Sequence, residues 1–304
     1  MPLIGSSDKN SSTSVDLSRL PAPDVVEQLG FEEIVDAMLA DLQARDPDFD
    51  ATVESEPAVK VIQVFAWREL ILRQAFNDRL RRYMLAFAGG STLDHVAAPF
   101  GVTRLVLDPG NPASGIPPTL ESDDELRRRV VLAPESYSVA GPELAYVFHA
   151  RSASGDVLDA SATTPAPGEV VISVLSRDGD GTAPPALLAE VQAAVGARDK
   201  RPVGDAVTVQ SAQIVPFEIR ATLYTFSGPD PDIVLAAART QLDAYLEESR
   251  RLGRNIPLSL ITARLAAAGV QRIVLTAPPG DVICSPLQAA HCTAITIVAG
   301  GVDE

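Results

Sequence analysis

Residues 58–88 form one continuous stretch in which large apolar side chains recur at the three- and four-residue spacing of an α-helix. One apolar row is made of Val61, Phe65, Leu72, Phe76, Leu80, Tyr83 and Phe87. A second row is made of Val64, Trp67 and Ile71. A helix that is apolar on more than one side has to be covered on each of those sides. The sequence therefore predicts a long helix that stops before Gly89-Gly90 and packs against several neighbours.

The composition is that of a folded protein with a strong negative charge. Of the 304 residues, 46% are hydrophobic and 21% are charged, which is typical of about two or three globular domains. The formal net charge of −15 opposes contact with phosphate backbones and with anionic membrane surfaces, so we expect no nucleic-acid partner and no membrane. The first twenty residues lack the pattern of a signal peptide, and we expect synthesis and assembly in a cytoplasm.

The predicted fold class is α+β, with an N-terminal helical region followed by two small α+β modules that contain mixed or antiparallel sheets. The expected parts are an extended arm at 1–23, a bundle-forming helical region at 24–106, a linker at 107–120, and modules at 121–213 and 214–304. Helices are expected at 31–42, 93–100, 125–132, 142–153, 184–195, 231–251 and 257–268. Strands are expected at 157–162, 169–175, 206–209, 214–226, 270–275 and 294–298.

Residues that could hold a metal do not form a complete site. Cys284 and Cys292 lie eight residues apart with His291 between them, whereas a closed zinc site needs four ligands, usually in tight pairs. The segment 178–182 begins like a calcium loop, but its twelfth position is Ala189, which cannot bind a cation. We expect two buried thiols and a glycine turn, with neither a metal nor a cofactor.

Catalytic motifs are also missing, and no nucleophile elbow, metalloprotease helix or phosphate loop occurs in the sequence. We therefore expect a protein that is not an enzyme. The sequence leaves one question open, which is whether two carboxylates lie at the separation needed for glycoside cleavage. That separation depends on the three-dimensional fold.

Five arginines gather on the long predicted helix of this acidic chain: Arg68, Arg73, Arg79, Arg81 and Arg82. One interpretation is a solvated face with weak pairs to nearby acids. The other is a helix that faces a partner, because arginine and aromatic residues are enriched where interfaces are strongest. The candidate interface residues are Leu72, Phe76, Arg79, Leu80, Arg82, Tyr83 and Phe87.

The same helix begins a series of segments that resembles the baseplate assembly protein J family of contractile-tailed phages. The segments are 68–78 (RELILRQAFND), 84–90, 93–97, 100–102, 121–129 (ESDDELRRR), 165–171, 175–182 (LSRDGDGT), 269–273 and 288–292. They occur in order along nearly the whole chain, whereas 1–25 and 107–120 contribute little.

The resemblance implies a structural baseplate wedge subunit of a phage tail or tailocin. It implies pairing with a second copy of the chain and with a companion wedge protein similar to tail protein I. Further contacts are implied with a sheath-initiator baseplate protein and with neighbouring wedges in a six-fold ring around the tail tube. In this interpretation the protein resides in the baseplate of the virion or tail particle, takes part in tail assembly and contraction, and uses residues 107–118 as a hinge. The family has no known catalytic residues.

Two other classes of function would require different features in the sequence. A tail-associated cell-wall hydrolase would need convergent carboxylates or a metal, and it is the alternative that a zymogram would detect. A receptor-binding tail fibre would show repeats and a β-rich pattern, whereas this chain is helix-rich and has no repeat.

Overall fold

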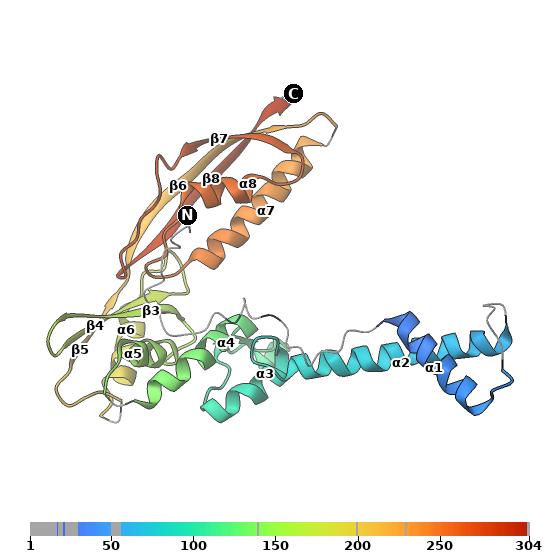
Figure 1. The fold of residues 1–304 in the computed structure, drawn as a ribbon. Coiled ribbons are helices and arrows are strands. Elements are labelled where there is room, and N and C mark those ends of the chain that lie inside the picture. Colours follow the sequence, from blue (N-terminus) through green and yellow to red (C-terminus); the bar gives the residue numbers. More distant parts are fainter. Residues whose placement is uncertain are drawn as a thin grey trace. The chain divides into compact units, whose positions relative to one another are not determined.

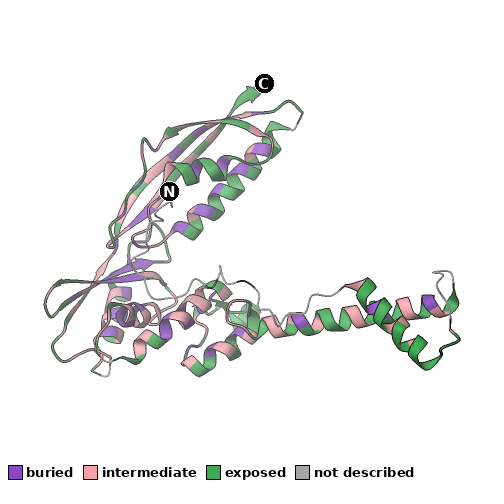
Figure 2. Cartoon of the chain, viewed as in Figure 1, coloured by how far each residue is buried: buried purple, intermediate pink, exposed green. Residues whose placement is uncertain are grey.

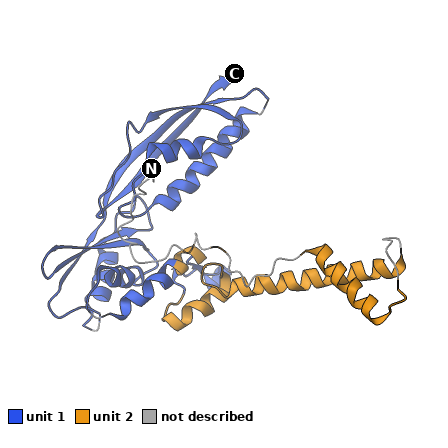
Figure 3. Ribbon diagram, viewed as in Figure 1, with its two compact units in different colours: residues 1–14, 104–122, 128–304 blue, residues 15–103, 123–127 orange. Residues whose placement is uncertain are grey.

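The computed structural model describes residues 17, 21, 30–49, 56–138, 140–198, 200–228 and 230–302. Apart from residues 17 and 21, the arm predicted at 1–23 lies outside this part of the chain. The chain divides into two compact units: residues 15–103 with 123–127 form one, and the remainder forms the other (Figure 3). Helix α4 (Asp123–Leu132) begins in the first of these and ends in the second.

The unit formed by residues 15–103 and 123–127, orange in Figure 3, is helical. It contains α1 (Phe31–Arg45), α2 (Pro57–Arg82), α3 (Gly90–Ala97) and a 3₁₀ turn (Ala98–Phe100) (Figure 1). Proline is favourable at the start of α2, because its missing N–H would have no partner in the first helical turn. The helix predicted at 58–88 stops earlier than expected, since residues 83–88 form turns. Three arginines in the last turn of α2 suit the negative end of the helix dipole.

The segment predicted as a linker carries a small antiparallel sheet. Its strands are β1 (Val106–Asp108) and β2 (Thr119–Leu120), and a 3₁₀ turn lies between them (Pro112–Ser114). The carboxylate of Glu121 accepts a hydrogen bond from the Leu105 N–H at 2.7 Å and pairs with the Arg129 guanidinium at 2.5 Å. Glu121 and Arg129 are only 3% and 5% exposed, so this is a buried ion pair. It fixes the base of the hairpin to α4.

The central module holds a mixed three-stranded sheet in the order β3-β4-β5. Its elements are a 3₁₀ turn (Ala133–Tyr137), α5 (Glu143–Arg151), β3 (Val157–Ala166), β4 (Glu169–Ser176), α6 (Pro185–Val195) and β5 (Ala206–Ser211). Strand β4 pairs antiparallel with β3 and parallel with β5. Helices α5 and α6 pack on the sheet, and the core includes Tyr146, Ile172 and Val191. The Tyr146 hydroxyl donates to Asp205 at 2.7 Å.

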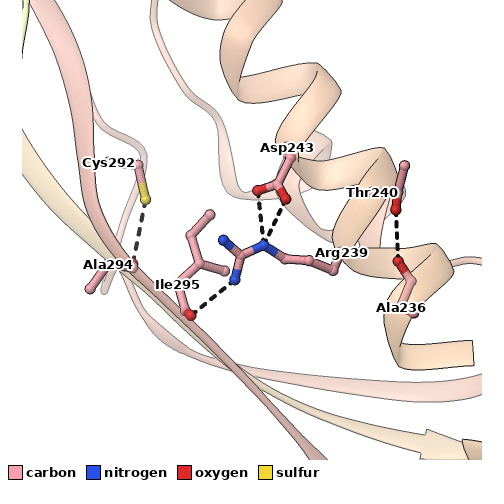
Figure 4. A network of polar contacts seen from close by, with 7 residues as sticks. All are labelled: Ala236, Arg239, Thr240, Asp243, Cys292, Ala294 and Ile295. Carbon is pink, nitrogen blue, oxygen red and sulfur yellow. Dashed lines mark hydrogen bonds and ion pairs between the residues drawn. The ribbon is translucent and has the colours of Figure 1, made fainter. Parts of the chain in front are cut away.

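The C-terminal module also holds a mixed three-stranded sheet, in the strand order β7-β6-β8, although its helices and strands follow a different order along the chain. Its elements are β6 (Gln213–Thr225), α7 (Pro231–Ser249), α8 (Leu258–Leu265), β7 (Val270–Ala277) and β8 (Gln288–Val302). Strand β6 pairs antiparallel with β7 and parallel with β8, and α7 and α8 lie over the sheet (Figure 1). Arg239 on α7 binds Asp243 through two hydrogen bonds and donates to the Ile295 carbonyl of β8 at 3.2 Å (Figure 4). This contact ties the helix to the sheet.

A seam joins the central and C-terminal modules, because only Ala212 separates β5 from β6. A small apolar cluster at the seam comprises Leu175, Ala212, Leu252 and Ala289 with Leu158 and Ile214. The Leu252 N–H donates to Asp159 at 3.0 Å, and Arg250 donates to the carbonyls of Arg177 and Gly179. Apolar and polar contacts therefore connect the two modules.

The predicted α+β class is confirmed, with helices first and sheet-containing modules after them. The five-part division of the chain, including a hinge at 107–118, stays a prediction. Within the described ranges no helix is both long enough and apolar enough to cross a membrane.

Candidate functional site

One side of α2 is covered by α1. Ile34 and Val35 of α1 pack against Ala66 of α2 to form a small buried cluster. The rings of Phe31 and Trp67 meet edge to face with their centroids 6.3 Å apart. This contact accounts for one face of α2 and leaves the others uncovered within the part of the chain that the structure describes.

Most of the large side chains of α2 remain exposed (Figure 2). The exposed apolar residues on α2 and in the turns directly after it are Val61, Val64, Phe65, Trp67, Ile71, Leu72, Phe76, Tyr83 and Phe87. Exposed apolar patches of this kind mark interaction surfaces, because monomers rarely leave large ones open to water.

The residues predicted from the sequence mostly share one face. Leu72, Phe76 and Tyr83 are 70%, 60% and 73% exposed, and their spacing puts them on one side of the helix. Arg79 is exposed on this side, and Leu80 is half-buried beside it.

The other two predicted residues depart from that face. Arg82 is exposed to one side of it, about 100° from Tyr83 around the helix. Phe87 lies beyond the end of α2, in the turns that follow. The spacing of apolar residues predicted a helix that continues through Phe87. This spacing carries no information about where the backbone hydrogen bonds of the helix end.

The turns after α2 are held by the start of α4. The Arg127 guanidinium donates to the carbonyls of Leu85 and Ala88 at 2.9 and 2.7 Å. The carboxylate of Asp123 accepts a hydrogen bond from the Gly90 N–H at 3.0 Å. The exposed Phe87 therefore sits on a braced turn, which limits the conformations it can take.

The exposed apolar surface begins nearer the N-terminus of α2 than the predicted interface, whose first residue is Leu72. Val61, Val64 and Phe65 were expected to need cover, but they were not included among the interface residues. Their exposure could have been inferred only by knowing that α1 is short and covers one face. That information depends on tertiary packing.

The remaining candidate residues have structural roles. Asp180 accepts a hydrogen bond from the Thr182 N–H at 2.9 Å, which lowers the pKa of its carboxyl group, and Gly179 and Gly181 adopt positive φ. The segment 178–182 is therefore a turn of the expected kind. Burial raises the pKa of the Cys284 and Cys292 thiols. Among the described residues, no cluster of three or more His, Cys, Asp or Glu side chains could hold a metal.

Comparison with known proteins identifies the family. Three family models match: the Baseplate J-like N-terminal domain at residues 54–111, the Baseplate J-like central domain at 138–211 and the Baseplate J-like protein C-terminal domain at 217–298. Baseplate protein J of Escherichia phage P2 is 47% identical over 300 residues, which cover 95% of this chain and 99% of that protein.

A solved structure is more distantly similar. A chain in the cryo-EM structure of the anti-feeding prophage baseplate, 6-fold symmetrised, matches 58% of this chain and 44% of its own length, with 15% identity and a TM-score of 0.40. The three domain models and the P2 relative together cover almost the whole sequence. The chain therefore belongs to the Baseplate J-like family of phage baseplate proteins.

Proposed function

We propose that this protein is a non-enzymatic wedge subunit in the baseplate ring of a contractile phage tail or tailocin. The observation that carries the proposal is the exposed apolar surface of α2 in a member of a baseplate family. In this role the protein is made in the host cytoplasm, takes part in assembling the ring around the tail tube and rearranges when the tail contracts.

The candidate interface lies on α2 and in the turns directly after it, and it consists of Leu72, Phe76, Arg79, Leu80, Arg82, Tyr83 and Phe87. Its partners in this proposal are a second copy of the chain and a companion wedge protein. The sheath-initiator protein and the neighbouring wedges complete the ring. Burial of apolar side chains stabilises such contacts by about 25 cal/mol per Å², which favours covering an exposed row of aromatic and aliphatic residues.

Co-expression with the companion wedge protein tests the assembly. The expected product is a defined complex that contains more than one copy of this chain, measured by light scattering coupled to size exclusion. Two separate monomer peaks at micromolar concentration would contradict the wedge role.

A charge reversal tests the α2 surface itself. The Arg79→Glu/Arg82→Glu variant should keep a near-native melting temperature, because exposed substitutions usually change stability by no more than about 0.5 kcal/mol. It should lose the complex, because reversing charges at a buried contact costs roughly 2–5 kcal/mol of binding. The matched control is Arg45→Glu/Arg198→Glu, which changes the net charge equally at two exposed positions outside α2. Normal assembly of the α2 variant would show that its arginines are only solvated.

A further inference from the structure

Strand β8 lies at one edge of the C-terminal sheet, whose strand order is β7-β6-β8. An edge strand turns the N–H and C=O groups of every second residue away from its sheet. The start of β8 uses these groups, because the Gly253 N–H donates to the Gln288 carbonyl at 2.9 Å and Leu252 bridges to Ala289. Further along, Arg239 of α7 donates to the Ile295 carbonyl at 3.2 Å (Figure 4).

The outer edge of β8 beyond Ile295 is open. Because the Ile295 carbonyl faces outward to Arg239, the alternation of a strand turns the backbone groups of Ile297 and Ala299 to the same side. Among the residues that the structure describes, none forms a hydrogen bond to these outward groups of Ile297 and Ala299. The edge therefore offers a row of backbone donors and acceptors.

The edge of the central sheet is closed by a side chain. Strand β5 ends that sheet, and Gln192 of α6 lies along it. The Gln192 Nε2 donates to the Val207 carbonyl at 3.1 Å, and its Oε1 accepts from the Val209 N–H at 3.0 Å. This amide occupies the place of a neighbouring strand and protects β5 from further pairing. Within the described ranges, β8 has no such cover after Ile295.

The sequence of β8 also lacks the residues that protect an edge. Residues 292–302 contain no charged residue and no proline, which are the residue types that normally keep a second strand from pairing. Val298 and Val302 are 48% and 57% exposed. An edge of this kind suits strand addition, in which main-chain hydrogen bonds supply the affinity.

Charge on α7 narrows the choice of the added strand. This helix carries four carboxylates against one arginine, Arg239; the carboxylates belong to Asp232, Asp243, Glu247 and Glu248. A second copy that paired antiparallel through its own β8 would bring its α7 to the same face of the joined sheet. The like charges of the two helices would oppose that contact. An extended segment without acidic residues meets no such repulsion.

We propose that the outer edge of β8 binds an extended segment of another protein, which adds to the C-terminal sheet as a fourth strand. The segment carries β-branched side chains, no Asp or Glu, and a Lys or Arg that faces the carboxylates of α7. The surface lies on a different element from the α2 interface, so the inference does not depend on the proposed wedge role.

Peptide binding to the full-length chain tests the proposal. The probe is a labelled peptide of alternating valine and threonine with a lysine at each end, and fluorescence anisotropy measures its affinity. One control peptide carries a methyl group on each backbone nitrogen between the lysines, which removes the N–H donors. The other has glutamate in place of both lysines. Each control should bind at least about tenfold more weakly than the probe.

Two substitutions at one position separate strand addition from other modes of binding. Ala299→Pro removes an outward N–H and should weaken binding of the probe at least about tenfold. Proline is tolerated in an edge strand where the N–H faces solvent, so this variant should stay folded. The matched control Ala299→Val has as many side-chain carbon atoms as proline but keeps the N–H, and it should bind the probe like the unchanged protein. Melting curves establish that each variant is folded.

Three results would overturn the proposal: no binding of the probe, equal binding of either control peptide, or unchanged binding to a folded Ala299→Pro variant. A dimer of the chain alone that blocks the probe, and that Ala299→Pro dissociates, would assign the edge to a second copy instead. If Ala299→Pro does not fold, the methylated peptide on the unchanged chain decides. The wedge role is tested separately, by complex formation with the companion protein.

Discussion

Replacing Glu121 by alanine should destabilise the fold strongly, because it removes one half of a buried ion pair. Its carboxylate binds Arg129 at 2.5 Å and the Leu105 N–H at 2.7 Å, and both charged residues are almost completely buried. Leaving a buried charge without its partner costs about 3–5 kcal/mol. An N–H that loses its acceptor costs about 1–3 kcal/mol, and the two effects overlap because they share one carboxylate. We expect a loss of about 4 kcal/mol, or roughly 10 °C in melting temperature.

Thermal and urea unfolding followed by circular dichroism would measure this loss. The matched control is Glu218→Ala, which removes an exposed carboxylate 2.9 Å from Arg220 and should cost no more than about 1 kcal/mol. The double variant Glu121→Leu/Arg129→Met should be more stable than Glu121→Ala, since it leaves no buried charge behind. If Glu121→Ala and Glu218→Ala unfold at the same temperature, burial of the Glu121 pair does not control stability and our reasoning is wrong.

Three further predictions address other parts of the chain. Phe76→Ala should leave the melting temperature of the isolated protein within the range of surface substitutions, about 0.5 kcal/mol, while size exclusion with the companion protein should detect weaker complex formation. Gly155→Ala should lower the melting temperature by the equivalent of about 1–3 kcal/mol, because its added Cβ would lie 2.4 Å from the Val106 carbonyl oxygen. Burial raises the pKa of Cys284 and Cys292, so less thiolate is present at a given pH; their reaction with a thiol reagent near pH 8 should be slower than that of an exposed cysteine and should speed up as the pH increases.

Hydrophobic periodicity predicted the helices and strands that depend on local sequence. Helix α1 spans 31–45, three residues longer than the expected 31–42, and it ends directly before Asp46 and Pro47. Strand β6 spans 213–225, close to the expected 214–226. These elements combine a clear apolar period with a terminating residue, and both properties are local.

Elements that depend on distant partners were predicted less well. Strand β8 spans 288–302, whereas only 294–298 was expected. Its ends are strand because they pair with β6, and Gly300 and Gly301 have no preference for extended structure. The contact between Asp159 and Leu252 joins residues 93 positions apart, so no local pattern indicates it.

The candidate surface illustrates the same limit. The sequence predicted that Leu72 and Phe76 need cover, but a periodic pattern is identical for a core helix and for a helix that awaits a partner. Only the packed structure separates these cases, through the exposure of both side chains. The sequence likewise does not indicate whether Arg68 and Arg79 are exposed or paired within the protein. The structure shows that both are exposed on α2.

The seam between the central and C-terminal modules determines how force travels through them. A flexible connection would let one module rotate while the other stays still, but here the connection is Ala212 alone, flanked by shared apolar packing. Arg250 also grips the carbonyls of the turn that follows β4, and Asp159 holds the backbone after α7. A pull on β8 would therefore be shared with β3 and β4 through these contacts.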